Sequence, residues 1–595
     1  MAEQLTNEQQ AAVDSRGRSL LVSAAAGSGK TKVLVERLFS YVEREGANLD
    51  DFLIITYTRA AASELRGKIA RALTERMERD PGNEHLRRQM LRVYRADIKT
   101  VDAFCTALLR ENCHLLGEDA RGHTLRPDFR VLDENDAQAL RERVLARTLD
   151  DFYDRLTPGG ALLADTLGAG RDDSALEALV LELHAKLQAQ PYEDKWLDAQ
   201  RALWSEVPDR IEKTPYGRIL LDEVRRKARH WQRLMQTAAQ EMTQNDALNQ
   251  KYAPAFLDIS YQLEALTAKA DEGWDAARGV SIAFPRLAPV KDSDGGKLKM
   301  RMKALWDGCK AAVKGFGELL NASSGEAAED LRTMAPAMLA LIDLTAEFSR
   351  RYNEEKRRRN AADFSDQEHE AIRLLIGEDG TPTELARTVS TRYREIMVDE
   401  YQDTNEVQNR IFDAISCKGE NLFTVGDVKQ SIYRFRLADP RIFLQHYNTW
   451  PPLAQAGEHE SAKLLLSRNF RSRKEVLEAT NFIFTNVLSA EMGELDYGED
   501  EMLRSGANYV PSDRCGAEFH LLDVPAQAGG QRVRASEAEA AFAAVYIHDM
   551  LTSKFPVQDE KTRELRPVRE EDIVILMRSP STRLLDYRRA LEARG

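Results

Sequence analysis

The feature that most constrains the fold is a loop of small residues, AAAGSGKT at residues 24–31, between segments of two different periodicities. Before it, Ser19–Ser23 is a short apolar run that predicts a buried strand. After it, apolar residues recur at helical spacing through VLVERLFSYVERE. Strand, glycine-containing turn and helix in this order indicate a parallel sheet covered by helices.

The same alternation of strand and helix continues to about residue 114, with further strands at Phe52–Tyr57 and from Ile98. It stops there, and residues 115–360 are long, charged and helical in pattern. It resumes with YREIMVDEYQDT, NLFTVGD and KLLLSRNF. We therefore predict an α/β nucleotide-binding domain made of residues 1–114 and 361–450, interrupted by an all-helical insertion at 115–360.

A Pro- and Gly-containing linker, WPPLAQAGEHES, follows near residue 450. Strand signals return at 463–466, 518–523 and 572–577, and a helix is predicted over EAEAAFAAVYIHDMLTS. Residues 451–595 are therefore expected to begin a second α/β domain that is incomplete at Gly595.

The composition excludes several classes of protein. The net charge of −13 argues against a protein that coats nucleic acid by bulk positive charge, although a local cationic groove is compatible with it. Five scattered cysteines without a C-x-x-C pair indicate buried thiols rather than a zinc site. Without an apolar segment of membrane-spanning length or a targeting segment at the start, a cytoplasmic protein without membrane contact is expected.

Two motifs predict ATP hydrolysis with Mg²⁺. The loop departs from G-x-x-x-x-G-K-[ST] only at Ala24, and we expect its backbone amides to hold phosphate oxygens. Lys30 would reach the β and γ phosphates, and Thr31 would hold Mg²⁺. At the end of an apolar strand, Asp399 is placed to hold the Mg²⁺ shell and Glu400 to polarise the attacking water. The phosphate-binding set is Ala24, Ala25, Ala26, Gly27, Ser28, Gly29, Lys30 and Thr31.

Six ordered motifs resemble those of superfamily 1 DNA helicases similar to UvrD, PcrA and RecB, and within that superfamily the AddA-type helicase–nuclease subunits. They are LTNEQQAAV, TYTRAAASEL, TVDAFC, VDEYQDT, VGDVKQSIYRFR and SRNFRS. The resemblance implies a RecA-like P-loop NTPase motor domain with the helical insertion, followed by an incomplete second RecA-like domain. It also implies an ATP-dependent helicase and translocase moving 3′ to 5′ on single-stranded DNA.

The resemblance assigns further roles. Gln9 would contact the adenine edge, and Phe470 would stack on the base. Gln430 would sense the γ-phosphate, and Arg471 would neutralise charge developing on it. The expected contacts to single-stranded DNA are Tyr57, Phe104, Tyr433 and Phe435. Arg59, Ala60 and Asp102 depart from the residues common in relatives, which weakens the expected DNA contacts of their motifs.

The implied partners are single-stranded and duplex DNA and an AddB-type subunit in a heterodimer that processes double-strand breaks. A C-terminal nuclease is expected in the parent but not in this chain, whose motor activity we expect to be impaired. Basic clusters at 225–229 with Arg233, at 297–303 and at 356–359 could contact duplex DNA, although solvated helix faces are the simpler interpretation. Alternatives are a stand-alone UvrD-like repair helicase, a nucleotide-responsive DNA-binding module and a P-loop ATPase acting on proteins or metabolites.

Overall fold

A six-stranded parallel sheet forms the centre of the α/β domain, with strand order β3-β2-β6-β7-β1-β8. The computed structural model describes residues 5–118, 122–167, 173–416, 419–490, 494–512, 514–524, 527–528, 531–532, 534–559 and 562–595. The strands of the sheet are β1 (Leu20–Ala24), β2 (Phe52–Thr56), β3 (Asp97–Thr100), β6 (Glu395–Val398), β7 (Leu422–Gly426) and β8 (Ala462–Leu466). The predicted α/β class is confirmed.

Helices cover both faces of this sheet, so its strands are apolar on both sides. Leu20 and Val22 of β1 pack into one core, whereas Leu21 between them packs into the other. The first face carries α1 (Asn7–Asp14), α2 (Lys30–Glu45), α3 (Arg59–Arg79) and α4 (Glu84–Arg92). The second carries α5 (Val101–Asn112), α16 (Phe364–Leu375), α17 (Glu384–Arg392), α18 (Glu406–Ile415) and α19 (Pro440–Thr449).

The sixth strand comes from beyond the linker at residue 450. Strand β8 pairs in parallel with β1, with Leu20 opposite Ala462 and Ala24 opposite Leu466. The sheet that carries the phosphate-binding loop therefore extends past the boundary expected at residue 450. The segment after Leu466 is consequently held directly beside the loop.

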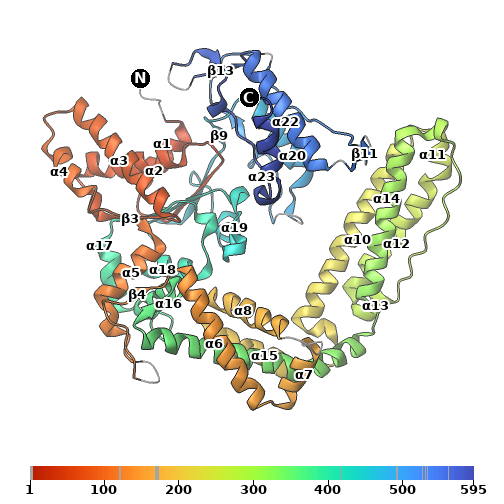
Figure 1. The fold of residues 1–595 in the computed structure, drawn as a ribbon, viewed down its shortest axis with the longest axis horizontal. Coiled ribbons are helices and arrows are strands. Elements are labelled where there is room, and N and C mark those ends of the chain that lie inside the picture. The colour runs from red at the N-terminus through yellow and green to blue at the C-terminus, as the bar shows by residue number, and fades with distance from the viewer. Residues whose placement is uncertain are drawn as a thin grey trace.

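The insertion is helical, as its pattern predicted, and it has two parts (Figure 1). Next to the α/β domain lie α6 (Glu134–Asp154), α7 (Pro158–Leu167), α8 (Ser174–Gln188), α9 (Glu193–Ser205) and the long α15 (Ser324–Arg358). A projecting arm contains α10 (Pro215–Met242), α11 (Asp246–Lys251), α12 (Ala253–Glu272), α13 (Trp274–Arg278) and α14 (Asp292–Leu319). Two short strands, β4 (Arg130–Val131) and β5 (Ala361–Ala362), pair where the chain enters and leaves the insertion.

After β8, the described strands pair only two at a time. The pairs are β9 (Arg468–Asn469) with β10 (Arg504–Ser505), β11 (Gln527–Ala528) with β12 (Gln531–Arg532), and β13 (Pro556–Gln558) with β14 (Leu565–Pro567). The helices here are α20 (Lys474–Val487), α22 (Ala535–Thr552) and α23 (Pro580–Glu592).

Two strand predictions in this region are wrong. The described residues at 518–523 and 572–577 form no strand, and apolar side chains such as Phe519 and Leu576 are exposed there. Apolar character alone does not make a strand, because each strand needs a neighbour to complete its hydrogen bonds.

In the described part of the chain, no helix combines the length and apolar character needed to cross a bilayer.

Candidate functional site

The loop after β1 has the geometry of an anion-binding turn. Gly27 and Gly29 both adopt positive φ angles, +68° and +84°, which glycine reaches without steric cost. A Cβ on Gly27 would also lie 2.7 Å from the Asn469 side chain. Helix α2 begins at Lys30, directly after the loop, so its N-terminal partial positive charge faces the same space. Ala24 ends β1 with negative φ, so its side chain fits the position.

Lys30 and Glu400 are in contact at the edge of the sheet where the parallel strands end, although they are far apart in the sequence. Lys30 Nζ lies 3.0 Å from Glu400 Oε2. Glu400 follows β6 with a left-handed backbone, φ +53°, which turns the chain away from the strand at this carboxylate. The motif predicted to bind phosphate and the motif predicted to activate water are thus in direct contact.

Next to this pair, Asp399 lies in a poorly solvated and negatively charged environment. Burial and the adjacent Glu400 raise the pKa of Asp399 to about 6, while Lys30 opposes the shift. Burial and Glu400 likewise raise the pKa of Asp403 to about 6. The site therefore has more carboxylate charge than Lys30 alone balances, which favours a cation.

The residues fit a bound magnesium nucleotide. The Ser28 hydroxyl is buried without a hydrogen-bond partner among the described residues, and so is Oδ1 of Asp403. The Thr31 hydroxyl and the Asp399 carboxylate are hard oxygen donors of the type that Mg²⁺ prefers. Thr31 would hold the ion beside the phosphates. Asp399, which follows β6, would hold the ion's coordination shell with its carboxylate.

A chain of hydrogen bonds leads from Glu400 to Gln430. Gln402 donates from Nε2 to Glu400 Oε2 (2.9 Å), and its Oε1 accepts from the Asp427 amide (2.9 Å). Gln430 in turn donates to Asp427 Oδ2 (2.7 Å). The sequence analysis did not single out Gln402 or Asp427. Their positions in the sequence could have indicated them, because each follows a predicted strand and the two strands end at the same edge of the sheet.

The residues expected to contact the base line a second part of the site. Gln9 and Phe470 border a pocket of about 720 Å³ together with Lys32 and Tyr509. Gln9 is buried, and its Nε2 donates to the backbone carbonyl of Ser28 in the phosphate-binding loop (2.9 Å). Further lining residues missed by the sequence analysis are Gly506, Ala507, Asn508, Val510, Gln558 and Arg563.

The segment after β8 is fastened to the phosphate-binding loop. Asn469 donates from Nδ2 to the Ala26 carbonyl (2.6 Å), and the Phe470 amide donates to the Gly27 carbonyl (2.8 Å). Asn469 Oδ1 also accepts from the Arg471 amide (2.8 Å). Arg471 itself is exposed. These contacts hold its backbone beside the loop.

The aromatic residues expected to contact DNA have different environments. Phe435 is 76% exposed, and its ring centroid lies 5.9 Å from that of the half-buried Tyr433. Tyr57 is half-buried, with its hydroxyl hydrogen-bonded to Thr404. Phe104 is only 4% exposed and packs in the core beneath the sheet, so the expectation that it stacks on DNA is wrong. Its place on the inner face of α5 explains this.

A groove of about 560 Å³ adjoins the same motifs. It is lined by Arg59, Asp102 and Phe364, among others. Phe364 begins α16 and is exposed, an environment that the sequence analysis did not anticipate. Burial raises the pKa of Asp102, and Arg59 opposes the shift. The unusual residues Arg59 and Asp102 thus line one groove and interact electrostatically, beside an exposed aromatic ring.

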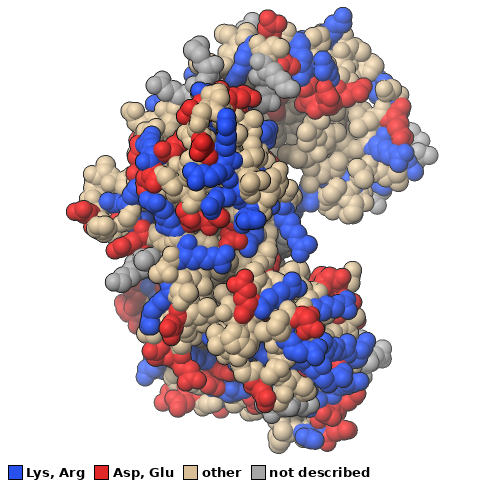
Figure 2. All heavy atoms as spheres, turned by 90° about the vertical axis from the view of Figure 1, so that its left-hand side faces the viewer, with Lys and Arg blue, Asp and Glu red and all other residues tan. Residues whose placement is uncertain are grey.

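Most basic residues of the insertion pair with neighbouring acids. Arg226 and Lys227 both pair with Glu223. Lys356 fits neither a DNA contact nor a solvated face, because it is 1% exposed and bonds Asp363 (2.9 Å) and Asp366 (2.6 Å). Figure 2 shows Lys and Arg interspersed with Asp and Glu over the face it presents.

The four described cysteines are free thiols, and Cys417 lies outside the described residues.

Comparison with known proteins finds matches along most of the chain. The UvrD/REP helicase N-terminal domain matches residues 5–451. An ATP-dependent helicase/nuclease subunit from Alkaliphilus oremlandii is 35% identical over 587 residues, covering 97% of this chain and 47% of the relative. The protein of the same name from Ruminiclostridium cellulolyticum is 33% identical over 621 residues, covering 96% and 49%. The chain spans about half the length of these curated relatives.

Proposed function

Because the chain belongs to the UvrD/REP helicase family, we propose that it is the motor portion of an ATP-dependent DNA helicase of the AddA helicase–nuclease type. The observation that carries this proposal is the contact between Lys30 and Glu400, at 3.0 Å. It joins the phosphate-binding residue to the residue that would activate water. The chain of bonds through Gln402 and Asp427 extends this unit to Gln430.

The chain's own residues divide the work of hydrolysis. Lys30 binds the terminal phosphates, which releases Glu400 to accept a proton from the attacking water. Gln430 senses the γ-phosphate, and Arg471 neutralises the charge that develops on it. Mg²⁺, when bound, neutralises phosphate charge and orients the triphosphate. Gln9 and Phe470 hold the adenine in the pocket that they line.

Phosphate binding would be transmitted to DNA through the segment after β7. Gln430 and Phe435 lie five positions apart, on the same short stretch of chain. The exposed Phe435 offers a face for base stacking, which is insensitive to sequence. One ATP cycle would therefore shift the bound strand, and the resemblance to superfamily 1 helicases implies travel in the 3′ to 5′ direction.

The wider role follows from the relatives. Each is named as one subunit of a helicase/nuclease, which supports action within a larger complex with a second, AddB-type subunit. The whole protein would unwind duplex ends and degrade DNA during double-strand break repair and recombination, in the cytoplasm. The nuclease would belong to the part of the relatives that this chain does not match.

DNA-stimulated ATP turnover tests the proposal directly. We expect single-stranded DNA to accelerate ATP hydrolysis by the 595-residue chain, and Lys30→Ala and Glu400→Gln each to reduce the rate by about a hundredfold or more. Lys314→Ala is the matched control, because Lys314 pairs with Glu318 on the exposed surface of α14. A rate of ATP hydrolysis that DNA does not change would instead indicate a P-loop ATPase with another substrate.

A nucleotide-responsive DNA-binding module is the second candidate. It is favoured by the described strands beyond Leu466, which pair only two at a time rather than in a second large sheet. Such a module would bind ATP and DNA with mutual dependence but would not turn ATP over. Equilibrium binding measured beside hydrolysis separates the two candidates.

A further inference from the structure

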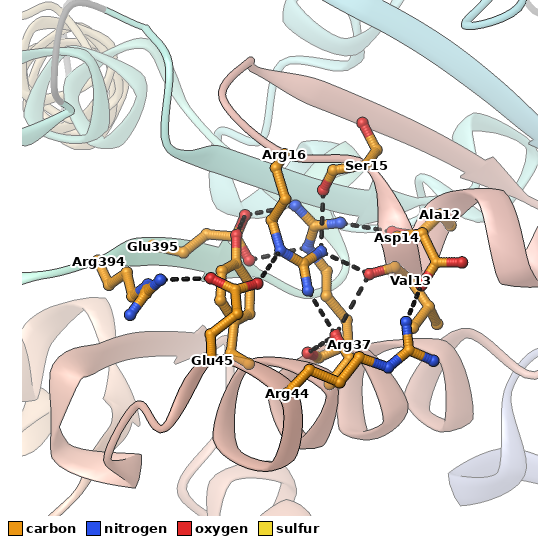
Figure 3. A network of polar contacts seen from close by, with 12 residues as sticks. Ala12, Val13, Asp14, Ser15, Arg16, Arg37, Arg44, Glu45, Arg394 and Glu395 are labelled. Carbon is orange, nitrogen blue, oxygen red and sulfur yellow. Dashed lines mark hydrogen bonds and ion pairs between the residues drawn. The ribbon is translucent and has the colours of Figure 1, made fainter.

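Arg37 is a fully buried arginine on α2, and all three of its nitrogens are engaged (Figure 3). Its Nε donates to Glu395 Oε2 at 2.8 Å, and its Nη2 donates to Oε1 of the same carboxylate. Its Nη1 donates to the backbone carbonyl of Ala12. The guanidinium also lies 4.5 Å from the centre of the Phe423 ring on β7.

These contacts join three elements that carry the candidate ATP site. Helix α2 begins with Lys30, and strand β6 begins with Glu395 and leads to Asp399 and Glu400. Helix α1 ends at Asp14, with Ala12 in its last turn, and its first turn carries Gln9. Arg37, seven residues along α2 from Lys30, therefore bonds the first residue of β6 and the last turn of α1, away from the residues that would touch the nucleotide.

The contact with Ala12 is one of several that fix α1 in place. The last carbonyls of a helix lack partners within the helix, so an arginine that bonds one of them holds the helix end in place. Arg16 repeats this arrangement nearby, because its Nη1 donates to the Val13 carbonyl (2.6 Å) and its Nη2 to the Ser40 hydroxyl of α2 (2.6 Å). The helix that presents Gln9 is thus clamped to α2.

Stability alone does not account for a buried pair of this kind. Replacing a buried ion pair by apolar groups of similar volume is often neutral or stabilising, because removing two charges from water is costly. A bidentate arginine, however, fixes direction and distance in a way that apolar contacts do not. This points to a geometric role for the Arg37–Glu395 pair.

We propose that Arg37 is a positioning residue for base recognition, which holds α1 against α2 and β6 so that Gln9 faces the base of the nucleotide bound at Lys30. The inference rests on the proposed function, since it takes a purine nucleotide as ligand. It adds a specific consequence, namely that discrimination between adenine and guanine depends on a side chain that never touches the base.

The test compares binding of ADP and GDP by competition against a fluorescent ADP analogue. The main variant is Arg37→Met with Glu395→Met, which removes both charges at similar volume. The control is Arg44→Met, because Arg44 also joins α2 to α1, through Asp14 at 2.7 Å, but does so on the exposed surface. A melting temperature is measured for each protein.

We expect the double variant to keep a cooperative melting transition, to bind ADP about tenfold more weakly and to lose most of its preference for ADP over GDP. Arg44→Met should resemble the wild type in all three respects. Arg37→Lys gives a second measurement if the double variant does not fold, because lysine keeps the charge beside Glu395 but cannot also reach Ala12. It should likewise lose selectivity.

Unchanged selectivity in a folded Arg37 variant would overturn the inference, and so would an equal loss in the Arg44 control or equal binding of ADP and GDP by the wild type. Failure of the proposed function gives a different result. In that case the wild type would show no nucleotide binding, or no stimulation of hydrolysis by DNA.

Discussion

At the scale of single residues, Phe435 and Phe104 show that the same type of side chain can lie in opposite environments. Phe435 is 76% exposed and Phe104 is 4% exposed. We expect Phe435→Ala to weaken binding of single-stranded DNA by about 1–3 kcal/mol, the value of one stacked base. Hydrolysis of ATP without DNA should not change, because Phe435 lies outside the nucleotide pocket. Fluorescence anisotropy with a labelled oligonucleotide measures the first effect.

Phe104→Ala provides the contrast. Removing a core phenylalanine costs about 3–5 kcal/mol of folding free energy. We therefore expect this variant to melt at a lower temperature, with DNA affinity retained by the fraction that stays folded. An equal loss of DNA affinity in both variants, without a change in melting, would contradict the assignment of Phe104 to the core.

Glu368 is a buried carboxyl group that is costly to ionise. Burial, and then the nearby Asp102, raise its pKa to about 7, while hydrogen bonds from Gln408 and Asn405 and the charge of His369 oppose the shift. The folded state thus binds this proton more tightly than the unfolded state does. This contribution to the free energy of unfolding is lost as the pH rises from about 4.5 to 7.

We expect Glu368→Gln to remove that loss. Relative to the wild type, the variant should gain stability between pH 5 and pH 8, by up to about 3 kcal/mol, since one pKa unit corresponds to about 1.4 kcal/mol. Urea unfolding at both pH values measures the difference. Glu384→Gln, an exposed change on α17, should follow the wild type. A parallel pH dependence of wild type and Glu368→Gln would show that Glu368 ionises normally.

At the scale of the elements, sequence periodicity predicted the six strands of the sheet closely. Ser19–Ser23 and Phe52–Tyr57 match β1 and β2 to within a residue at either end. These segments are buried on both faces, and such strands are continuously apolar. The apolar segments at 518–523 and 572–577 have the same local signal without a neighbouring strand in the described part of the chain. The local apolar pattern is therefore the same in both cases, whereas burial and strand pairing depend on distant segments.

The candidate site was predictable where a motif concentrates its residues, as with Lys30 and Glu400. Gln402 and Asp427 could not be found in the same way, because their hydrogen bond exists only once β6 and β7 are adjacent. The sequence analysis did not single out Arg37, which is one charged residue in the helical segment VLVERLFSYVERE. Its burial depends on Glu395, a residue more than 350 positions away.

Replacing either of two glycines in the arm by alanine should change the stability of the arm, with opposite signs at the two positions. In the first turn of α10, a Cβ on Gly217 would lie 2.0 Å from the Ile211 carbonyl oxygen, whereas one on Gly315 of α14 would meet nothing within 4 Å. Gly315→Ala should stabilise the arm by up to about 1 kcal/mol through helix propensity. Gly217→Ala should destabilise it by about 1–3 kcal/mol through overpacking. Thermal unfolding followed by circular dichroism compares the two, and a similar shift in both would contradict the crowding at Gly217.

At the scale of the whole molecule, the apolar cores are divided between the α/β domain, which we propose to be the motor, and the arm. Two clusters pack on the faces of the sheet, and a separate cluster, which includes Met235, Phe256 and Trp306, fills the arm. Smaller clusters lie where α15 runs between these regions. Regions with separate cores can unfold separately, because few buried contacts couple them.

We therefore expect calorimetry to resolve an arm transition from a motor transition. Phe256→Ala should lower the first, because its ring is fully buried in the arm, and Phe412→Ala should lower the second, because its ring is fully buried beneath the sheet. ADP should raise only the motor transition, since ligand at a hundred times its Kd stabilises the state that binds it by about 2.7 kcal/mol. A single transition that both substitutions and ADP shift together would mean that arm and motor unfold as one unit. The arm would then be an integral part of the ATP-binding body rather than an appendage that could move with DNA while the motor keeps its nucleotide.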